Sequence, residues 1–402
     1  MQIFKKNCHF CTPLLIYLSK LLMKLFDVYP LYNVEPVSAL GFEIIDSKGD
    51  TYFDFYGGHA VISIGHSHPK YIKSLTDQLN RIAFYSNSVL NPMQNEVAQR
   101  IADVSGLNNY QLFFVNSGAE ANENALKLAS FHNGRKKVIA FKKAFHGRTS
   151  AAVNVTPDAK IVAPINATFE KVFFDLTDIE GVCEEIFQGD VAAVIIEGIQ
   201  GVGGVHVPSA ELLQKIQKAC TLTDTVLILD EVQSGYGRSG KFFAFQHAEG
   251  VEPDVVTMAK GMGNGFPVGG LLIHEKFAPR MGMLGTTFGG NQLACAACIS
   301  VLDVIKSENL MHNAQVIGDY AMAELKKVHG VKEVRGMGLM IGFSFDFPIA
   351  ELRKRLVYNE HIFIGSSSEP NTIRFLPPLT IGKKEIDILV AALNRAIATL
   401  FS

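Results

Sequence analysis

The chain has 402 residues, a hydrophobic fraction of 48% and a formal net charge of −2 at pH 7. This length suits two domains rather than one small core, and the composition is that of a well-buried globular protein. Because acidic and basic residues are balanced and mixed, we expect neither a nucleic-acid surface nor a polybasic membrane patch. Six cysteines in a chain this long indicate no disulfide framework, which favours a reducing, cytoplasmic location.

The N-terminal segment has a basic start and a short apolar run, Pro13–Leu18, which no small-residue cleavage site follows. No segment of the chain approaches the roughly 18 uninterrupted apolar residues of a membrane helix. Met23 opens a more ordinary enzyme beginning, so we expect residues 1–22 to be a non-native or disordered extension. Peptides from before Met23 in the natively expressed protein would contradict this. Cys8 and Cys11 form an isolated C-x-x-C, for which we expect no metal or redox role.

Strand and helix patterns follow in chain order. Phe42–Asp46 and Thr51–Phe55 predict a β-hairpin, and amphipathic periodicity predicts helices over Pro69–Phe84 and Pro92–Val104. Strands and helices then alternate. The predicted strands are Gln111–Asn116, Lys137–Phe141, Val191–Glu197, Thr225–Asp230 and Asp254–Met258, and the predicted helices are Glu120–His132, Leu176–Phe187 and Ala210–Thr221. Because these strands are short continuous apolar runs, they indicate a parallel sheet with helices on both faces.

Beyond about residue 290 the pattern changes. We predict helices at Gln292–Ser307, at Ala314–Val328 and from Lys383, and strands at Lys332–Arg335, Leu339–Phe345 and Thr372–Phe375. Cys295 and Cys298 lie in the first of these helices and are expected to serve its packing. The fold class is therefore α/β, with a smaller lobe formed by both chain ends. We assign residues 23–69 and 291–402 to this lobe and residues 70–290 to the large domain.

Polar residues follow three of the predicted strands, where ligands collect in open parallel sheets. Asp230 and Lys260 each come after a buried apolar run, where a charge is costly without a partner. Together they meet the two demands of pyridoxal phosphate (PLP): a carboxylate for the pyridine nitrogen and an amine for the aldehyde. Ser117-Gly118-Ala119 opens a helix, whose free N–H groups suit a phosphate, and Ser117 and Glu120 fit a capping box.

Each of these features has a plainer reading on its own. Asp230 could be a turn residue, Lys260 a solvated loop lysine and the Ser117 motif an ordinary helix start. The joint placement after buried strands, with a glycine-rich loop behind Lys260, favours the cofactor. His66 and His68 are spaced H-x-H, but no further ligands follow in order, so we predict no metal site.

From about residue 30 to the C-terminus the sequence resembles the class III (ornithine/acetylornithine-type) aminotransferases. The matching stretches are Phe55–Val61, Gly65–Pro69, Asn116–Glu123, Phe145–Arg148, Leu229–Gly235, Met258–Gly261, Thr286–Asn291 and Ile373–Phe375. The resemblance implies fold-type I of PLP enzymes, with a large, mostly parallel seven-stranded sheet domain and a smaller α/β lobe. It also implies a homodimer.

The resemblance implies roles around the cofactor ring. Lys260 is similar to the Schiff-base lysine, which also shuttles the proton, and Asp230 to the partner of the ring nitrogen. Phe145 is implied to stack on one ring face and Val232 to press on the other. Gln233 is implied to lie near the ring hydroxyl.

Further roles concern the phosphate and the substrate. Three residues at a helix start are implied to bind the phosphate: Ser117, Gly118 and Ala119. Thr287 is implied to reach the same phosphate from the partner chain, so that two chains share each active site. Arg148 and Arg374 are implied to receive substrate carboxylates, although each could be a surface salt bridge without its motif. Glu197 completes the implied substrate site.

One position departs from the family pattern E-P-x-Q-G-E-G-G, which here reads Glu197-Gly-Ile-Gln-Gly-Val-Gly-Gly204. Val202 replaces the glutamate that, in ornithine-type members, screens the arginine matching Arg374. An acylated α-amine cannot react at the wrong end, so an N-acylated ornithine needs no such screen. We therefore hypothesise that the enzyme uses N-acetyl- or N-succinyl-ornithine.

The expected reaction is transfer of the δ-amino group of N²-acylornithine to 2-oxoglutarate, in arginine biosynthesis. Aminotransferases for 4-aminobutyrate, ornithine or another ω-amine remain open. An aminomutase of the glutamate-1-semialdehyde type is a further alternative, and it would need no external acceptor. A non-enzymatic PLP-binding protein is disfavoured because the lysine, the aspartate and both arginines are all present.

Overall fold

A computed structural model describes residues 25–400. The chain divides into two units, residues 1–35 and 36–402. The described part of the first unit, residues 25–35, contains no helix or strand. The predictions for residues 1–22, Met23, Cys8 and Cys11 lie outside the described residues. All the secondary structure considered below belongs to the second unit.

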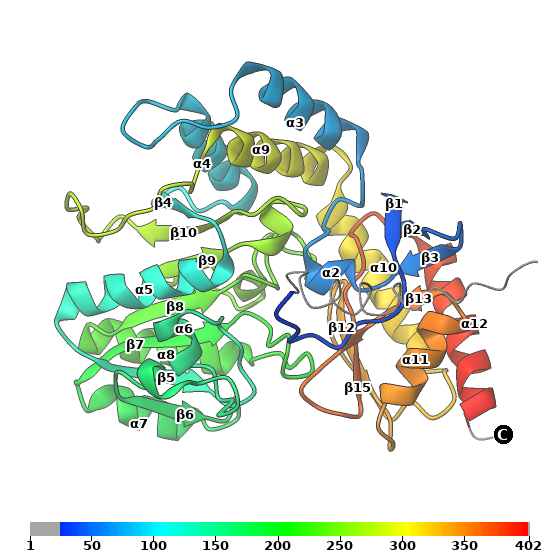
Figure 1. Ribbon diagram of the computed structural model, residues 1–402. Helices are drawn as coiled ribbons and strands as arrows, with labels where there is room; N and C mark the ends of the chain where they lie inside the picture. The colour runs from blue at the N-terminus through cyan, green and yellow to red at the C-terminus, as the bar shows by residue number, and fades with distance from the viewer. Residues whose placement is uncertain (1–24, 401–402) are drawn as a thin grey trace, which may run out of the picture. The chain divides into compact units, whose positions relative to one another are not determined.

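The second unit is built around a seven-stranded sheet with the order β4-β10-β9-β8-β7-β5-β6 (Figure 1). Its strands are β4 (Tyr110–Val115), β5 (Lys137–Phe141), β6 (Lys171–Phe174), β7 (Val191–Glu197), β8 (Val226–Asp230), β9 (Val255–Met258) and β10 (Gly269–His274). Pairing is parallel from β9 through β6, whereas β10 runs antiparallel to both of its neighbours. The predicted, mostly parallel seven-stranded sheet is therefore confirmed.

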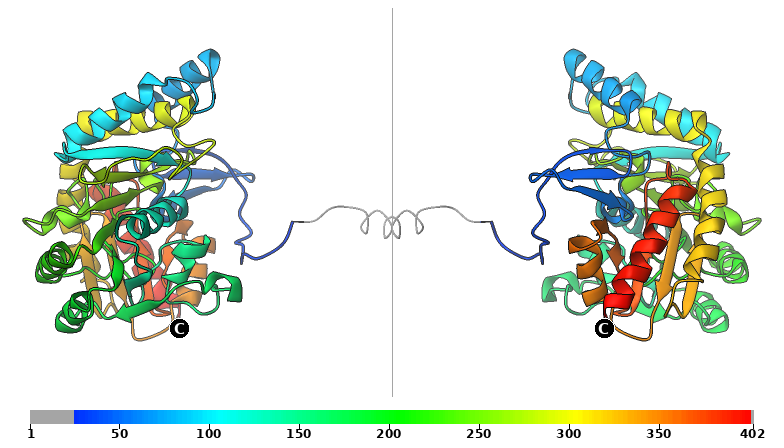
Figure 2. Two further views of the ribbon diagram at one scale, coloured as in Figure 1. Left: turned by 90° about the vertical axis from the view of Figure 1, so that its left-hand side faces the viewer. Right: turned by 90° about the vertical axis from the view of Figure 1, so that its right-hand side faces the viewer.

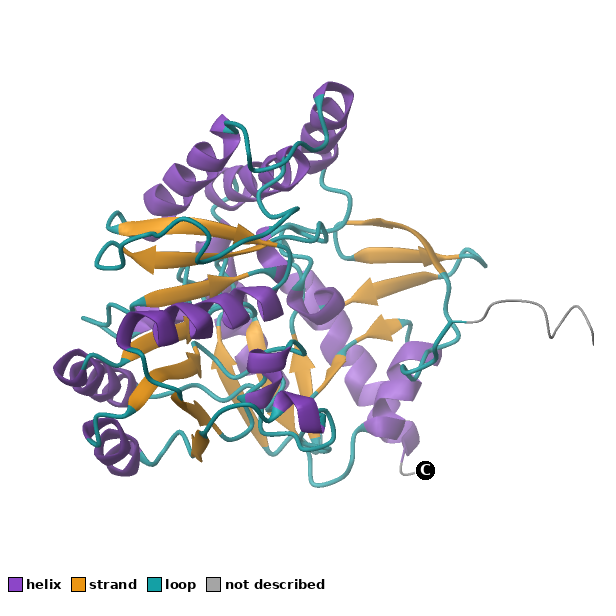
Figure 3. Cartoon of the chain, turned by 60° about the vertical axis from the view of Figure 1, so that its left-hand side comes forward, coloured by secondary structure: helices purple, strands orange, loops and turns teal. Residues whose placement is uncertain are grey.

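Helices cover both faces of this sheet (Figure 3). The helices of this part of the chain are α3 (Pro69–Arg81), α4 (Pro92–Ser105), α5 (Gly118–Asn133), α6 (Ser150–Asn154), α7 (Ile179–Phe187), α8 (Ala210–Thr223) and α9 (Gln292–Ser307). Of these, α3 packs on α9 and α6 on α5. Successive side chains of β7 point to opposite faces of the sheet. Ile195 belongs to the apolar cluster that includes α5, whereas Val194 and Ile196 belong to the cluster that includes α8 and α9. Every residue of β7 and of β8 is buried, as the continuous apolar runs predict.

Two four-stranded sheets make up most of the remainder. The first has the order β1-β2-β3-β13, with β1 (Pro36–Leu40), β2 (Glu43–Asp46), β3 (Thr51–Asp54) and β13 (Ile362–Phe363). The second has the order β11-β12-β15-β14, with β11 (Glu333–Met337), β12 (Met340–Ser344), β14 (Gly365–Ser366) and β15 (Thr372–Phe375). Because β13 pairs with β3, one sheet joins the N-terminal hairpin to the C-terminal part of the chain.

Three helices pack beside these sheets: α10 (Leu310–Leu325), α11 (Ala350–Tyr358) and α12 (Lys383–Leu400). Helix α12 contacts both α10 and α11 (Figure 2). The short elements are α2 (Gly57–Ala60), η1 (Pro164–Asn166), η2 (Ala244–His247) and η3 (Lys260–Met262). No helix among residues 25–400 is long and apolar enough to cross a membrane.

Most predicted elements are present, with boundaries shifted by a few residues. The chief omissions were β1, β6, β10 and α11. Strand β10 begins with Gly269 and Gly270, which carry no β-favouring side chain, so its apolar stretch is short. Cys295 and Cys298 are buried on α9, as expected for helix packing.

Candidate active site

The candidate site lies at the carboxyl ends of the parallel strands. Glu197 ends β7 and is paired with Asp230, which ends β8 and is in turn paired with Thr257 of β9. Lys260 follows the end of β9. The register of the sheet therefore brings these strand ends together. A cavity of about 240 Å³ lies here, lined by Gly118, Ala119, Asn122, Phe145, His146, Gly147, Arg148, Glu197, Asp230, Val232, Gln233 and Lys260.

The Asp230 carboxylate is buried and fixed by three nitrogen atoms. Its Oδ2 accepts a hydrogen bond from Nδ2 of Asn122 at 2.7 Å and lies 2.7 Å from Nδ1 of His146. Its Oδ1 accepts from the backbone N–H of Val232 at 3.0 Å. The hydroxyl of Thr257 donates to Asn122 Oδ1 at 2.7 Å and so orients the amide. A carboxylate held this firmly is suited to a fixed positive partner in the cavity.

Asn122 and His146 were not assigned roles from the sequence, although both lie inside motifs that matched the family. The signal that could have identified them is their position. Asn122 lies one helical turn after the start of α5, and His146 directly follows Phe145. A buried aspartate needs such partners, so polar residues in neighbouring motifs were the candidates to consider.

Lys260 has an unusual backbone conformation and an altered basicity. Its φ of 47° is in the left-handed region, which non-glycine residues seldom adopt and which is common at functional sites. Burial lowers the pKa of its ammonium group to about 8, an effect that the charges of Asp230 and Glu197 partly oppose. At pH 7 about a tenth of its amine is therefore free to react with a carbonyl, far more than for a lysine of ordinary pKa.

Glu197 is also buried, but both of its carboxylate oxygens are engaged by backbone. Oε1 accepts from the N–H of Phe145 at 3.0 Å, and Oε2 accepts from the N–H of Gly201 at 2.9 Å. Burial raises the pKa of Glu197 to about 7; nearby His146 opposes this rise and Asp230 adds to it. In this arrangement Glu197 connects the Phe145 loop to the loop after β7. Its direct contact with a substrate stays a prediction.

The start of α5 has no room for a side chain at Gly118, although Gly118 and Ala119 both line the cavity. Ser117 is the N-cap, and its Oγ accepts from the N–H of Glu120 at 3.2 Å. The predicted capping box forms only in part, because the Glu120 carboxylate accepts from the N–H of Asn116 rather than of Ser117. A Cβ on Gly118 would lie 2.5 Å from Cγ1 of Val232, so glycine is required for this close packing. Gly118 and Ala119 of this helix start line the cavity, and backbone N–H groups at a helix start are suited to an anion.

Arg374, on β15, is 4% exposed and contacts three segments of the chain. Its Nε donates to the carbonyl of Ser366 at 2.5 Å, its Nη2 to the hydroxyl of Tyr56 at 2.9 Å, and its Nη1 to Oε1 of Gln233 at 3.3 Å. Burial lowers the pKa of Arg374. Arg374 does not line the cavity itself, but Gln233 does, so the arginine lies directly beside it.

The other predicted residues occupy different surroundings. Arg148 is exposed at the cavity, with its Cζ 5.9 Å from the ring centroid of Phe145. Thr287 is exposed in the loop between β10 and α9 and does not line the cavity of this chain. Val202 is half-buried in the loop after β7, where its carbonyl accepts from the N–H of Ser368 at 2.8 Å.

Comparison with known proteins agrees with this geometry. A model of the family described as Aminotransferase class-III matches residues 29–397. The acetylornithine aminotransferase of Bacillus subtilis (strain 168) is 40% identical over 385 residues, which cover 93% of this chain and 97% of that protein. The acetylornithine aminotransferase of Methanocaldococcus jannaschii is 38% identical over 391 residues, covering 93% and 96%.

Solved structures show the same fold. A structure of ornithine aminotransferase from Toxoplasma gondii, described as having partial occupancy of PLP at its active site, superposes with a TM-score of 0.86. It is 27% identical and covers 96% of this chain and 93% of its own. A thermostable (S)-enantioselective ω-transaminase from Thermomicrobium roseum has a TM-score of 0.82 at 27% identity, covering 93% and 96%.

The family implies pyridoxal phosphate, and the residues of the cavity fit it. They provide a lysine amine of lowered pKa, a fixed carboxylate and a glycine-tight helix start for a phosphate. The chain belongs to the class III aminotransferases, and it is a PLP-dependent enzyme of the fold-type I class.

Proposed function

We propose that this enzyme transfers the δ-amino group of an N²-acylornithine to 2-oxoglutarate, within ornithine metabolism and arginine biosynthesis. The donor is converted to the corresponding N-acyl glutamate semialdehyde, and the acceptor to glutamate. Acetylornithine aminotransferases that are 36–40% identical over most of the chain support an ornithine derivative as donor. The observation that carries the proposal is the electrostatic state of Arg374.

Arg374 is a buried cation held by uncharged acceptors. The carbonyl of Ser366, the amide of Gln233 and the hydroxyl of Tyr56 fix its orientation without neutralising its charge. A buried charge of this kind favours an anionic ligand, and the planar guanidinium suits a carboxylate. Both N-acylornithine and 2-oxoglutarate carry a carboxylate at the end remote from the reacting group, so one arginine can serve both half-reactions.

Val202 supports an acylated donor. It occupies the position at which the family pattern has a glutamate, and a valine side chain offers Arg374 no counter-charge. Free ornithine could then react through either amine, whereas acylation of the α-amine leaves only the δ-amine. The absence of the carboxylate also leaves space for an additional carboxylate, as in a succinyl group.

The remaining residues have roles that follow from their surroundings. PLP, when bound, supplies an aldehyde that captures the amino group and a ring that accepts an electron pair. We propose that Asp230 keeps the ring nitrogen protonated, that Phe145 and Val232 contact the two ring faces, and that Gln233 lies near the ring hydroxyl. The amine of Lys260, once free, moves the proton at the substrate carbon.

The substrate assignment is tested by glutamate formation from 2-oxoglutarate with PLP-loaded enzyme. N-acetyl-ornithine, N-succinyl-ornithine, ornithine and 4-aminobutyrate are offered separately. Turnover of an acylated ornithine well above the other two supports the proposal and identifies the acyl group. Turnover of only ornithine or 4-aminobutyrate contradicts it, and activity without 2-oxoglutarate would indicate an aminomutase. Val202→Glu should weaken use of N-succinyl-ornithine more than that of N-acetyl-ornithine; equal effects would contradict the interpretation of Val202.

We also propose a homodimer in which Thr287 binds the phosphate in the partner's site. Large apolar side chains are exposed near this loop: Phe84 is 41%, Leu90 96%, Met281 104% and Phe288 58% exposed. The rings of Phe84 and Phe288 lie 5.4 Å apart, so their surface is continuous. Exposed apolar patches of this kind mark protein interfaces.

Mixing two inactive variants tests the shared site. Lys260→Ala removes the reactive amine, and Thr287→Asp places a negative charge against the phosphate. If the site is shared, both defects fall in one site of a mixed dimer and the other site is intact, so co-refolded mixtures regain a fraction of the wild-type activity. If Thr287 acts within its own chain, each site of the mixed dimer has one defect, and the mixture stays inactive.

A further inference from the structure

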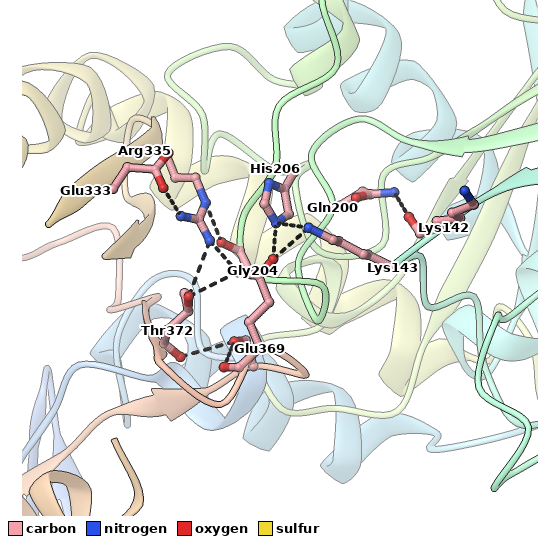
Figure 4. A network of polar contacts seen from close by, with 10 residues as sticks. Lys142, Lys143, Gln200, Gly204, His206, Glu333, Arg335, Glu369 and Thr372 are labelled. Carbon is pink, nitrogen blue, oxygen red and sulfur yellow. Dashed lines mark hydrogen bonds and ion pairs between the residues drawn. The ribbon is translucent and has the colours of Figure 1, made fainter. Parts of the chain in front are cut away.

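Glu369 is the centre of a charged network at the edge of the site (Figure 4). Its Oε1 accepts from Nζ of Lys143 at 2.8 Å and lies 2.8 Å from Nε2 of His206. Its Oε2 accepts from Nη2 of Arg335 at 2.7 Å and from the hydroxyl of Thr372 at 3.0 Å. These four partners come from four separate segments: the turn after β5, the loop after β7, β11 and β15.

The carboxylate is held in its ionised form by these contacts. Partial burial opposes ionisation, but hydrogen bonds from Lys143 and His206 outweigh it and lower the pKa of Glu369 to about 2. Lys143, His206 and Arg335 therefore all contact a carboxylate that stays ionised at every ordinary pH, and Arg335 has a second carboxylate partner in Glu333. A glutamine at this position could not replace it, because its amide nitrogen would face Lys143 or Arg335 as a second donor.

The network holds the loop from Gln200 to His206, which carries Val202. Gln200 and His206 exchange backbone hydrogen bonds of 2.9 and 3.1 Å that close the base of this loop. A Cβ on Gly204 would lie 2.6 Å from Oε2 of Glu369, so the loop and the carboxylate are in direct contact. The carbonyl of Gly204 also accepts from Nε of Arg335 at 2.9 Å.

The same network fixes the segment on the other side of the loop. Ser368 precedes Glu369 and donates its N–H to the carbonyl of Val202 at 2.8 Å. Thr372, which donates to Glu369, is two residues before Arg374 on β15. The carbonyl of Ser366, in this same segment, is the acceptor for Nε of Arg374. Glu369 thus contacts the Val202 loop directly and is three residues from Ser366, whose carbonyl orients Arg374.

We propose that Glu369 is a positioning residue that sets specificity for carboxylate-bearing substrates, by holding the Val202 loop against the segment that orients Arg374. This inference rests on the proposed role of Arg374 as the carboxylate receiver. Glu369 itself contacts none of the residues that line the cofactor cavity. Its loss is therefore expected to change substrate binding and to leave cofactor binding intact.

The test compares Glu369→Gln with Glu333→Gln in the PLP-loaded enzyme. Glu333 pairs with the same Arg335 from the opposite side at 2.7 Å and is 59% exposed, so it is a matched control. For Glu369→Gln we expect the KM of the keto-acid acceptor to rise about tenfold with kcat within about threefold, because misplacement weakens binding of the carboxylate. Glu333→Gln should behave as wild type.

Two further readouts separate positioning from general damage. Glutarate, a dicarboxylate that cannot react, should bind about tenfold more weakly to Glu369→Gln when followed by the absorption of the bound cofactor. The affinity for PLP and the KM of an amine donor without a carboxylate should not change. An unchanged KM and glutarate affinity would overturn the inference, as would an equal loss of PLP affinity.

If Glu369→Gln does not fold, Lys143→Gln is used instead, because it removes one donor to Glu369 from a half-exposed position. For this variant we expect a smaller rise, about threefold, in the KM of the keto-acid acceptor. No rise there would likewise overturn the inference. The substrate panel on wild-type enzyme decides the proposed function separately. Each readout here is a ratio of variant to wild type, so it holds for whichever carboxylate-bearing donor the enzyme uses.

Discussion

The two sides of the site are built by different means. On the cofactor side, Glu197, Asp230 and Lys260 lie at the ends of neighbouring buried strands, so the sheet register alone places them. On the proposed carboxylate side, Arg374 is oriented by Tyr56, which is 318 residues away in the chain, and by the carbonyl of Ser366 on β14. Under the proposed function, the chemistry depends on the register of one sheet, whereas specificity depends on contacts between segments that are distant in the chain. Changes on the first side should act on the cofactor and on kcat, and changes on the second side on KM.

The strongest test of the cofactor side is Lys260→Ala. Removal of the amine that captures the cofactor and moves the proton should lower kcat by at least ~10³-fold, given the usual size of proton-transfer catalysis combined with the loss of covalent attachment. The visible absorption of the bound cofactor should also change. Lys384→Ala, at an exposed lysine of α12, is the control and should have wild-type rates. Wild-type turnover by Lys260→Ala would contradict the assignment.

Asp230 and Glu231 offer a sharper test, since they are adjacent, buried carboxylates with different partners. Asp230→Asn should lower kcat by about 10²–10³-fold, because the fixed negative charge against the ring nitrogen is lost. Glu231 instead accepts from Ser234 and from the N–H groups of Ala244 and Phe245, and burial raises its pKa to about 7. Glu231→Gln should destabilise the fold by about 1–3 kcal/mol and change kcat little. Thermal unfolding and kcat are measured for both variants. A large loss of kcat in Glu231→Gln with little change in Asp230→Asn would contradict the roles assigned to the two carboxylates.

The same contrast explains how much could be predicted from the sequence. Apolar runs that end in Asp230 and Lys260 predicted both the sheet and the cofactor side, because parallel strands end at one edge. Strand β10 was omitted, because its glycines weaken the strand pattern. The roles of Asn122 and His146 could not be predicted from the sequence, because they follow from contacts with Asp230 that only the fold reveals. Glu369 could not be predicted, since its partners lie on four segments and no local pattern joins them.

On the carboxylate side, Arg374→Lys should raise the KM values for the keto-acid acceptor and for the amino donor by about 10–100-fold, because a lysine cannot form the paired hydrogen bonds of a guanidinium. The visible absorption of the bound cofactor and the kcat with an amine lacking a carboxylate should be unchanged. Arg395→Lys, a 62% exposed arginine that pairs with Glu360, is the control. If kcat fell for every donor alike, the separation between the two sides would be wrong.

The smallest expected effect concerns the pH dependence of cofactor capture. Burial lowers the pKa of Lys260 from 10.5 to about 8, so the free amine makes up about a tenth of the apoprotein at pH 7 and about nine tenths at pH 9. The rate of PLP capture should therefore rise about tenfold over this range and then level off. With an ordinary lysine the rate would continue to rise to about pH 10.5.

The same shift makes stability depend on pH with a sign opposite to that of a lysine whose pKa is raised by an ion pair. Between about pH 8 and 10.5 the native apoprotein binds fewer protons at Lys260 than the unfolded chain does, so its stability should increase with pH across this window. Below about pH 8 the full cost of burying the charged ammonium group is present. In Lys260→Met, the free energy of unfolding measured with urea from pH 7 to 10 should no longer show the increase with pH that Lys260 causes. An unchanged slope would show that the amine is well solvated before the cofactor binds, and that the cofactor side is less preformed than the sheet register implies.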